Sequence, residues 1–439
     1  MADNADNSRR LWQVLDITRA MVAASDLDEL LGLIIRRSME LLGAERASLF
    51  LYDSSRDELI SRIAHEAGEI RFSATAGIAG AVVRGRSSLN IPDAYADARF
   101  NRQIDSRTGF RTRNILALPL LDYSGALVGV LEVLNKRAGG FDADDLRLAE
   151  ALAAQAGVAL QRARLLEEYA AKQRMEQSLA IARQIQQDLL PKESPRVAGF
   201  DIAGWSCPAD ETGGDIFDFF PMGQGRWAMV LADATGHGIG PALIVAEARA
   251  MLRALSMRQA GEGRGPQPDM AEIMAKVNEL LVADLSCSRF VTCLFAVLEE
   301  AASSVRCVSA GQGPILFYRA CQDDFEELPA TALPLGVMAE VDFDQCRGPQ
   351  SRNAGIGDPI QRRLGSGDMM IAITDGFFEA ADAAGEQFGM GRVRQIVRDS
   401  RALPAGQIIQ RLHQAVEQFT GLSRQADDLT AIIVKRISP

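Results

Sequence analysis

The sequence predicts an α+β protein, in which a small module of helices and strands is followed by one long helix and by a strand-rich module flanked by helices. Short apolar segments bounded by turn-forming residues occur before residue 135 and again after residue 215, which is typical of strands. Between Phe141 and Pro191 the only glycine is Gly157 and there is no proline, so roughly 48 residues can form a nearly continuous helix. With 439 residues, and about 100 to 200 residues in a usual domain, the chain should hold two or three domains.

The first module begins with helices and continues with strands. Residues 8–43 have the pattern of two amphipathic helices, broken near residues 25–27. Strand-like segments follow at 46–52, 59–65, 114–121 and 126–134, and the turn sequence DYSG separates the last two. These segments predict a small α/β module.

The long helix carries one apolar seam. Its residues are spaced alternately by four and three, and they are Leu152, Ala156, Ala159, Ala163, Leu166 and Ala170, extended by Ile181, Ile185 and Leu189. This spacing predicts a coiled-coil-like linker, and we expect two copies of the chain to form a homodimer through this linker and the first module. Because alanine buries little area per turn, a terminal domain helix followed by an unrelated second helix is the alternative.

After Pro191 the pattern changes to apolar runs beside glycine and aspartate. The predicted strands are 216–220, 227–232, 290–298, 315–318, 369–374 and 429–434. The predicted helices are 240–257, 269–284 and 404–420. Strand-rich layers flanked by helices would satisfy this order.

Composition excludes several classes of protein. The net charge of -11 opposes binding to nucleic acid, and no CxxC pair among the six cysteines indicates a thiolate zinc site. The longest run without a charged residue, Ala234 to Ala246, is shorter than the roughly 20 apolar residues that span a bilayer. The first residues, MADNADNSRR, do not resemble a signal peptide. We therefore expect a cytoplasmic protein without membrane insertion.

Aspartates at the ends of four apolar runs carry the main functional signal. They are Asp215 before IFDFF, Asp233 after WAMVLA, Asp375 after MMIAIT, and the pair Asp427 and Asp428 before LTAIIVK. A single aspartate beside a strand is usually a turn former. If the strand ends converge, however, these carboxylates repel one another strongly, and divalent cations held by oxygen ligands would relieve the repulsion.

Oxygen-only ligand sets suit magnesium or manganese rather than zinc. Two such ions can activate a water molecule and stabilise charge on a phosphoryl group, which is the chemistry of phosphomonoester hydrolysis. No GxSxG elbow and no GxxxxGK[ST] phosphate loop offers a rival mechanism. His237, within GHG, is interpreted as a turn or helix-start histidine in preference to a proton-transfer group.

An ordered set of motifs in the second module resembles the SpoIIE-type (RsbU-like) branch of the PPM metal-dependent serine/threonine protein phosphatases. The motifs are QIQQDLLP (184–191), PADETGGDIFDFF (208–220), LADATGHGIGPAL (231–243), FVTCLFAVLE (290–299), SAGQGPILF (309–317), LGSGDMMIAITDGFFEA (364–380) and ADDLTAIIVK (426–435). The resemblance implies a β-sandwich flanked by helices, two Mn²⁺ or Mg²⁺ ions, and a phosphoserine or phosphothreonine protein substrate, typically an anti-anti-sigma factor with a STAS fold.

The same resemblance assigns the site residues. The metal aspartates of the family map onto Asp215, Asp233, Asp375 and Asp427, with the Ala234 carbonyl as a further ligand; Asp428 is the alternative at the last position. The family often has AGH where this chain has AGQ, so we expect Gln312 to change contacts on the substrate side without removing a metal ligand.

Residues 76–136 resemble the GAF sensor domains of cyclic-nucleotide phosphodiesterases and adenylate cyclases. The family's NKFDE set is present as Asn135, Lys136, Phe141 and Asp145, with a leucine in place of the final glutamate. That set usually forms a structural brace, in which an ion pair from Lys136 to Asp145 closes the pocket. The resemblance implies a possible cyclic-nucleotide ligand, and a GAF domain that only dimerises is the alternative.

Together these features predict a GAF sensor domain at 1–160, a helical coiled-coil-like linker at 161–192 and a PPM/SpoIIE-type phosphatase domain at 193–439. The predicted function is signal-regulated hydrolysis of phosphoserine or phosphothreonine on a partner protein by a two-metal activated water. A catalytically inactive scaffold that binds the same partner is the alternative, although an inactive relative would be expected to lose metal ligands. A cyclic-nucleotide-hydrolysing enzyme is a third hypothesis, but the chain lacks the histidine-rich metal site that it needs.

Overall fold

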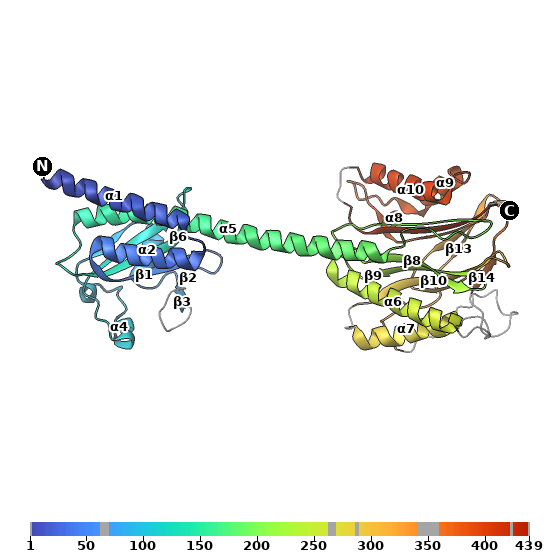
Figure 1. Cartoon of the computed structure of the whole chain (residues 1–439), viewed down its shortest axis with the longest axis horizontal. Coiled ribbons are helices and arrows are strands. Elements are labelled where there is room, and N and C mark those ends of the chain that lie inside the picture. The colour runs from blue at the N-terminus through green and yellow to red at the C-terminus, as the bar shows by residue number, and fades with distance from the viewer. Residues whose placement is uncertain are drawn as a thin grey trace. The chain divides into compact units, whose positions relative to one another are not determined.

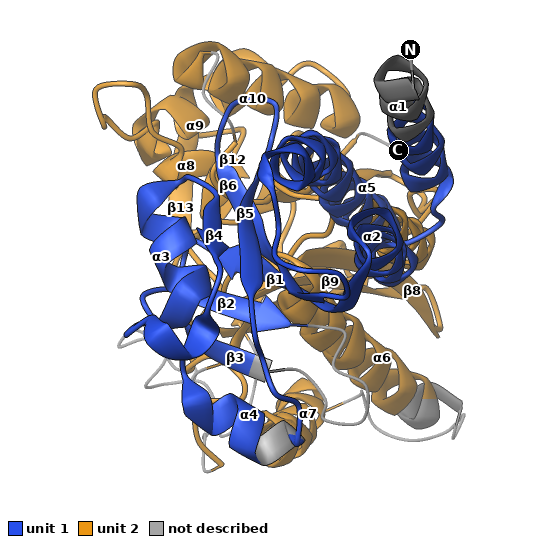
Figure 2. Ribbon diagram, turned by 90° about the vertical axis from the view of Figure 1, so that its left-hand side faces the viewer, with its two compact units in different colours: residues 1–175 blue, residues 176–439 orange. Residues whose placement is uncertain are grey.

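The computed structural model describes residues 2–61, 70–261, 269–285, 289–339, 360–421 and 425–437. The chain forms two compact units, 1–175 and 176–439, which Figure 2 shows in blue and orange. The division lies inside a single helix, α5 (Ala143–Leu189). The three domains expected from the sequence, and the two boundaries between them, therefore remain predictions.

Unit 1 contains a six-stranded antiparallel sheet with the strand order β3-β2-β1-β6-β5-β4. Its strands are β1 (Ala44–Asp53), β2 (Glu58–Ser61), β3 (Ile70–Ser73), β4 (Leu89–Ile91), β5 (Ile115–Leu121) and β6 (Leu127–Lys136). Its helices are α1 (Ala2–Ala23), α2 (Leu27–Leu42), α3 (Gly77–Gly85), α4 (Arg102–Thr108) and the first part of α5, with a short 3-10 turn, η1 (Ala94–Ala96).

The sheet of unit 1 has one apolar core on each face, because successive side chains of a strand point to opposite sides. In β6, Leu131 and Val133 pack in the core that contains residues of α1, α2 and α5, whereas Val130 packs with residues of α3. Helix α2 begins where the Asp26 side chain accepts the N–H of Glu29, and it ends at Gly43 in the left-handed conformation.

The predictions for unit 1 are confirmed in outline. The two expected N-terminal helices are α1 and α2, and three of the four expected strands are β1, β5 and β6. The fourth, 59–65, is observed as β2 up to Ser61, and its remaining residues lie outside the described ranges. Strands β3 and β4 and helices α3 and α4 were not predicted from the sequence.

Unit 2 contains two five-stranded antiparallel sheets, with the orders β14-β11-β10-β9-β8 and β13-β12-β15-β16-β7. The strands are β7 (Phe200–Cys207), β8 (Asp215–Gly223), β9 (Arg226–Ala234), β10 (Val291–Glu299), β11 (Ser304–Ala310), β12 (Ile315–Arg319), β13 (Asp324–Leu328), β14 (Ile360–Arg363), β15 (Met369–Ile373) and β16 (Leu429–Arg436). The helices are α6 (Ile239–Gly261), α7 (Met270–Asp284), α8 (Gly376–Glu379), α9 (Gly389–Asp399) and α10 (Ala405–Thr420).

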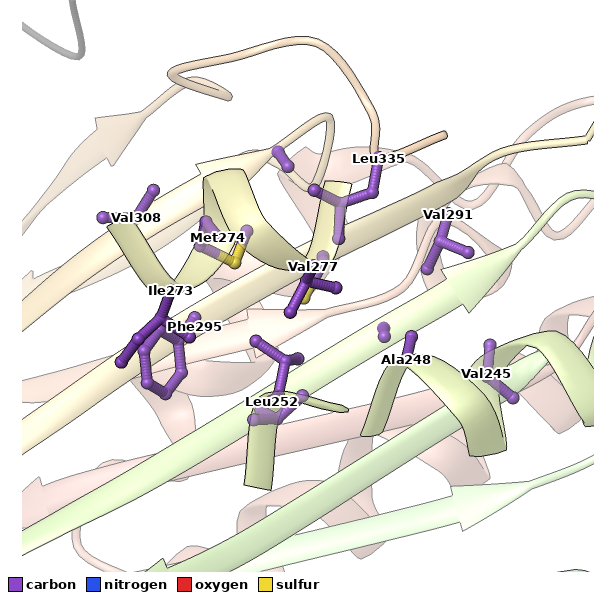
Figure 3. Packing of buried hydrophobic residues seen from close by; sticks show 14 of the residues in the cluster. Val245, Ala248, Leu252, Ile273, Met274, Val277, Val291, Phe295, Val308 and Leu335 are labelled. Atoms are coloured by element: carbon purple, nitrogen blue, oxygen red, sulfur yellow. The ribbon is translucent and has the colours of Figure 1, made fainter. Parts of the chain in front are cut away.

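The two sheets of unit 2 pack face to face, and helices cover both outer faces (Figure 1). Side chains of α6 and α7 pack on β10 and β11, as the buried residues Val245, Ile273 and Phe295 in Figure 3 illustrate. A second apolar cluster joins α8, α9 and α10 to the other sheet. This four-layer arrangement confirms the α+β class and the helix-flanked sandwich expected from the sequence.

Burial on both faces explains why the strands of unit 2 read as continuous apolar runs. In β9, Val230 and Ala232 belong to the core beneath α6 and α7, whereas Met229 and Leu231 lie between the sheets. All four residues are at most 1% exposed. Burying a side chain of the size of methionine or leucine in this way stabilises the fold by about 1.5–3 kcal/mol.

Helix α5 confirms the long uninterrupted helix expected from the sequence. The apolar seam, however, does not have one role along its length. Leu152 and Ala156 are buried in the core of unit 1, whereas Leu166, Ile181 and Ile185 are 55%, 62% and 60% exposed. The N-terminal part of the seam is therefore a packing surface of unit 1, and a coiled coil along the remainder stays a prediction. No helix within the described ranges is long and apolar enough to cross a membrane.

Candidate metal centre

Aspartates from both sheets of unit 2 lie at one end of the sandwich. Asp215 opens β8 and faces Asp233, near the end of β9, in the antiparallel pair. Asp375 follows β15, while Asp427 and Asp428 directly precede β16, which pairs with β15. A hydrogen bond joins the two sheets here, because Oδ2 of Asp428 accepts the N–H of Asp215 at 3.2 Å.

Thr374 fixes the carboxylate of Asp215. Its hydroxyl donates to Oδ2 of Asp215 at 2.8 Å and accepts the N–H of Thr430 at 2.9 Å. Thr374 is 1% exposed, so neither bond competes with bulk water. Thr374 was not predicted as a site residue from the sequence, although it directly precedes Asp375 in the TDG motif.

The two residues of the DD pair have different surroundings. Asp428 is 3% exposed, and its carboxylate accepts the N–H of Ala209 at 2.7 Å as well as that of Asp215. Asp427 caps its own neighbour, since its Oδ1 accepts the N–H of Asp428 at 2.8 Å. Asp428 therefore serves to hold the 209–215 segment.

Glycines of the GGD motif permit the close packing around these carboxylates. A Cβ atom at Gly213 would lie 2.5 Å from Oδ2 of Asp428, and one at Gly214 would lie 2.7 Å from the carbonyl oxygen of Ala234. Such distances are shorter than any real contact, so a side chain at either position would push Asp428 or Ala234 away.

The electrostatics of the cluster are those of crowded carboxylates. Burial, together with the charges of Asp375, Asp427 and Asp428, raises the pKa of Asp233 to about 8. Burial and the charges of Asp233 and Asp428 likewise raise the pKa of Asp215 well above its usual value. The protein therefore holds several acidic groups where ionising all of them is costly.

The pKa values of the aspartates beside the other sheet are raised as well. Burial, and then the charges of Asp427 and Glu379, raises the pKa of Asp375. Burial also raises the pKa of Asp428, although the N–H groups that it accepts act in the opposite direction.

The donor set fits a hard divalent cation, because it consists of carboxylate oxygens and one carbonyl oxygen whose mutual repulsion a cation would relieve. As the side chains stand, however, no three His, Cys, Asp or Glu residues in the described part of the chain form a group that could hold a metal ion. The centre thus offers the oxygen ligands of a metal site, but the described side chains do not converge on one metal position.

The end of α5 contacts this site through Gln186, a residue whose role was not predicted from the sequence. Its side-chain oxygen accepts the N–H of Gly213 at 3.0 Å, and its amide nitrogen donates to the carbonyl of Gly213 at 2.7 Å. Gly213 stands two residues before Asp215. The only sequence signal for this contact is the QIQQDLLP motif that contains Gln186.

His237 is exposed to solvent, whereas Gln312 is buried. Nδ1 of His237 lies 2.6 Å from Oδ2 of Asp210, and the His237 side chain is 66% exposed. Gln312 is buried, where it donates to the Ile373 carbonyl at 3.0 Å and accepts from Thr292 at 2.8 Å. The amide of Gln312 thus joins β10 to the end of β15, and its effect on contacts on the substrate side stays a prediction.

The NKFDE-like residues of unit 1 form a brace. Lys136 pairs with Asp145, as expected, and Phe141 is buried and its carbonyl accepts the side chain of Asn90 at 2.9 Å. Asn135 is fully buried, and its side chain binds the backbone N–H of Arg113 at 2.6 Å. These contacts tie strands and α5 together within unit 1.

Unit 1 also contains a desolvated acidic group that was not predicted from the sequence. Desolvation raises the pKa of Glu132, in β6, to about 7, although the N–H of Ala79 in α3 donates to it. The apolar sequence around Glu132, GVLEVLN, gives no sign that its carboxylate is desolvated against α3.

Two families match the chain. Residues 223–437 match Stage II sporulation protein E (SpoIIE), and residues 26–160 match the GAF domain. The first match includes Asp233, Asp375, Asp427 and Asp428, and it begins after Asp215.

Curated relatives share only part of the chain. The probable 3',5'-cyclic phosphodiesterase pde-5 of Caenorhabditis elegans is 33% identical over 199 residues, which cover 42% of this chain and 27% of that protein. The dual 3',5'-cyclic-AMP and -GMP phosphodiesterase 11 of Drosophila melanogaster is 35% identical over 153 residues, which cover 30% and 10%. The chain thus matches about a quarter or less of the length of these relatives.

Two of the solved structures that are similar to the chain are phosphatase domains. The SiaA-PP2C domain of Pseudomonas aeruginosa is 21% identical, with 61% of this chain and 99% of that chain covered and a TM-score of 0.49. The PP2C phosphatase domain and regulatory fragment of SpoIIE from Bacillus subtilis is 12% identical, with 99% and 97% covered and a TM-score of 0.43. From the two family matches, the chain joins an N-terminal GAF domain to a C-terminal domain of the SpoIIE family.

Proposed function

We propose that the chain is a signal-regulated, metal-dependent phosphatase that removes phosphate from serine or threonine of a partner protein. The observation that carries this proposal is the meeting of aspartates from both sheets at one end of the sandwich, where Asp233 has a pKa of about 8. A cluster that resists full ionisation in the bare protein is a strong site for cations.

Asp215, Asp233, Asp375 and Asp427 are the proposed ligands, together with the carbonyl of Ala234. The hydrogen bonds of Asp428 support this assignment over the alternative, because both its oxygens already accept backbone N–H groups. When bound, two Mn²⁺ or Mg²⁺ ions would supply an activated water and neutralise charge on the phosphoryl group.

The chain's own residues prepare the site for that chemistry. Thr374 holds the carboxylate of Asp215 through a bond of 2.8 Å, and Asp428 fixes the backbone on either side of the GGD turn. Burial and neighbouring carboxylates raise the pKa values of Asp215 and Asp233 in the bare protein. A bound cation would favour the ionised form of these groups and so lower the cost of keeping them together.

The proposed partner is a phosphorylated STAS-domain protein, on the strength of the resemblance to SpoIIE-type phosphatases. A scaffold that binds the partner without hydrolysis is the second candidate. The retention of all five acidic residues together with the Thr374 support argues against it, because binding alone needs neither.

Regulation is proposed to pass from the GAF domain along α5 to the GGD turn. Gln186 near the end of α5 binds both backbone groups of Gly213, so a rotation of this helix segment would move the residues before Asp215. The names of the curated relatives and the GAF match suggest a cyclic nucleotide as input, and the exposed seam residues of α5 suggest a homodimer. Calorimetry with cAMP and cGMP on the full chain tests the first point, since no heat at millimolar nucleotide would leave the GAF domain without this role.

The test of the activity is phosphate release from phosphoserine, phosphothreonine and phosphotyrosine peptides, and from phosphorylated STAS proteins, with and without Mn²⁺. The proposal predicts Mn²⁺-dependent release from the first two peptides and from a STAS substrate. Stable binding of the phosphorylated partner without any release would favour the scaffold.

A further inference from the structure

We propose that Gln312 sets the separation between the two halves of the carboxylate cluster, and that the affinity of the centre for divalent cations depends on this residue. The inference rests on the proposed metal-dependent function and deepens it. It assigns Gln312 a positioning role, in which the side chain acts through Thr292 and Ile373 and not as a metal ligand.

The two ends of the Gln312 amide bind different sheets of unit 2. Its Oε1 accepts the hydroxyl of Thr292 in β10 at 2.8 Å, and its Nε2 donates to the carbonyl of Ile373 in β15 at 3.0 Å. A carbonyl oxygen can only accept, so the nitrogen must be the end of the amide that faces Ile373. One neutral side chain therefore bridges the sandwich through two directional bonds.

Each partner of Gln312 is next to a proposed metal ligand. Thr292 lies directly opposite Asp233 in the antiparallel pair of β10 and β9, and its hydroxyl is 3.5 Å from the Asp233 carbonyl oxygen. Ile373 ends β15 two positions before Asp375. The bridge therefore joins the strand pair that carries Asp233 to the strand that leads into Asp375.

The backbone of Gln312 is held independently of its amide. The hydroxyl of Ser309 donates to the Gln312 carbonyl, and the N–H of Gly311 donates to the carbonyl of Ala332 at 2.8 Å. Gly311 has a φ angle of 74°, and a Cβ atom there would lie 2.5 Å from Cγ of Pro334. Because the turn after β11 is fixed in this way, the Gln312 side chain extends towards the other sheet from an anchored base.

Directional bonds are needed at this point because the rest of the sandwich is apolar. Side chains such as Leu231 and Ile432 fill the space between the sheets, and their attraction has no preferred direction. Hydrogen bonds, in contrast, weaken steeply when their angle becomes poor. Gln312 is 5% exposed and Ile373 is 1% exposed, so bulk water does not compete for the bond between them.

Gln312 completes a second attachment between the sheets at the metal end. Asp428 and Thr374 already bind Asp215, which lies in the edge strand β8. Gln312 instead acts on β10, the central strand of the same sheet, and β9 with Asp233 lies between these two strands. A sheet attached at one strand can still rotate about that point, whereas a second attachment removes this freedom. The position of Asp233 relative to the other sheet is therefore fixed from both sides.

Two substitutions remove the bridge with little change in volume. Gln312→Met keeps an unbranched side chain of similar length but has no amide, so it removes both bonds. Thr292→Val removes only the hydroxyl that Gln312 accepts. Neither change adds a charge beside the carboxylates, as a glutamate at position 312 would.

The test measures the Kd of Mn²⁺ by isothermal titration calorimetry on the full-length wild type, on both single variants and on the double variant. Loss of residues that orient metal ligands commonly lowers metal affinity about 10- to 100-fold, so we expect Kd to rise about 10-fold or more in Gln312→Met and about threefold or more in Thr292→Val. The double variant should match Gln312→Met, because the bond to Thr292 is already lost there.

The control is Gln361→Met, which removes the bond of 2.9 Å from Nε2 of Gln361 to the hydroxyl of Ser304. That bond joins β14 to the end of β11 that lies away from Gln312. The control should bind Mn²⁺ as the wild type does. Melting of all variants in chelator reports any general loss of stability separately.

An unchanged Kd in either folded single variant overturns the proposal, and so does a double variant in which the two losses multiply. A wild type that binds no Mn²⁺ refutes the metal centre and this inference with it. A wild type that binds Mn²⁺ but releases no phosphate from a phosphoserine peptide refutes only the phosphatase function, and the predicted order of Kd values then still decides the role of Gln312.

Discussion

Replacing Asp233 by asparagine should make the metal-free protein more stable and the metal-loaded protein less stable than the wild type. The pKa of Asp233 rises from 3.8 to about 8 in the folded state, chiefly through burial and then through the charges of Asp375, Asp427 and Asp428. A folded-state pKa above the unfolded value means that stability is fully present below pH 3.8. It is lost as the pH rises towards about 8.

The size of the effect follows from this shift. At pH 7 the folded protein keeps the proton on Asp233 and the unfolded chain has lost it, which costs about 1.36 kcal/mol for each pH unit above 3.8. The cost at pH 7 is therefore on the order of 4 kcal/mol, and an asparagine avoids it. Saturating Mn²⁺ acts in the other direction, since a concentration of 100 times Kd stabilises the wild type by about 2.7 kcal/mol.

The assay is thermal melting of the transition of unit 2 in the full chain, from pH 5 to pH 8, in chelator and in Mn²⁺. We expect Asp233→Asn to melt above the wild type in chelator, by a margin that grows with pH, and to gain much less from Mn²⁺. Asp399→Asn, on the exposed end of α9, is the matched control and should change neither value. If Asp233→Asn melts below the wild type in chelator, the repulsion argument is refuted.

Three further results are expected. Gln186→Ala removes both bonds to Gly213, so basal phosphatase activity should change while binding of Mn²⁺ persists; activity and regulation identical to the wild type would exclude this contact as a control point. Because the pKa of Glu132 is about 7, the free energy of unfolding of unit 1 should fall by on the order of 3 kcal/mol as the pH rises from 4.5 to 7. Glu132→Gln should abolish this dependence on pH in thermal melts, and an unchanged dependence would contradict the desolvation of Glu132. Insertions near Glu167 rotate the flanking helix segments by about 100° per residue, so activity should depend on insertion length and return towards the wild type at seven; equal activity after one, two, four and seven residues would make α5 a passive tether.

The sequence was sufficient where local pattern decides the structure. The absence of proline and the single glycine between Phe141 and Pro191 predicted α5, and continuous apolar runs predicted the inner strands β9, β10 and β16. Strand β7 was missed because Gly204 interrupts its apolar pattern. That glycine is needed because a Cβ atom there would lie 2.4 Å from the ring of Phe217.

The residues of the candidate site also fall into two groups, those that the sequence predicted and those that it did not. The aspartates stand at the ends of apolar runs, and two of them, Asp215 and Asp375, directly adjoin a glycine, so the sequence identified them. Thr374 and Gln186 act through partners 159 and 27 residues away, and Gln312 through a carbonyl 61 residues away, so their roles depend on how the sheets pack. Contacts between residues so far apart along the chain cannot be predicted from the local sequence.

The apolar seam of α5 shows a second limit of prediction from the sequence. A four-and-three spacing predicts an apolar face, but it does not say what covers that face. Leu152 is buried in the core of unit 1, whereas Ile181, with the same spacing, is exposed. Only the tertiary structure separates a packing surface within one unit from a surface left open for a partner.

The most direct test of the central claim is Mn²⁺-dependent phosphate release from a phosphoserine peptide by the full chain, measured for the wild type and for Asp375→Asn. We expect no release in chelator and release on addition of Mn²⁺. For Asp375→Asn we expect a rate lower by on the order of 100-fold or more, with an unchanged circular dichroism spectrum. Release that persists in chelator, or a folded Asp375→Asn protein with a rate near that of the wild type, would contradict it.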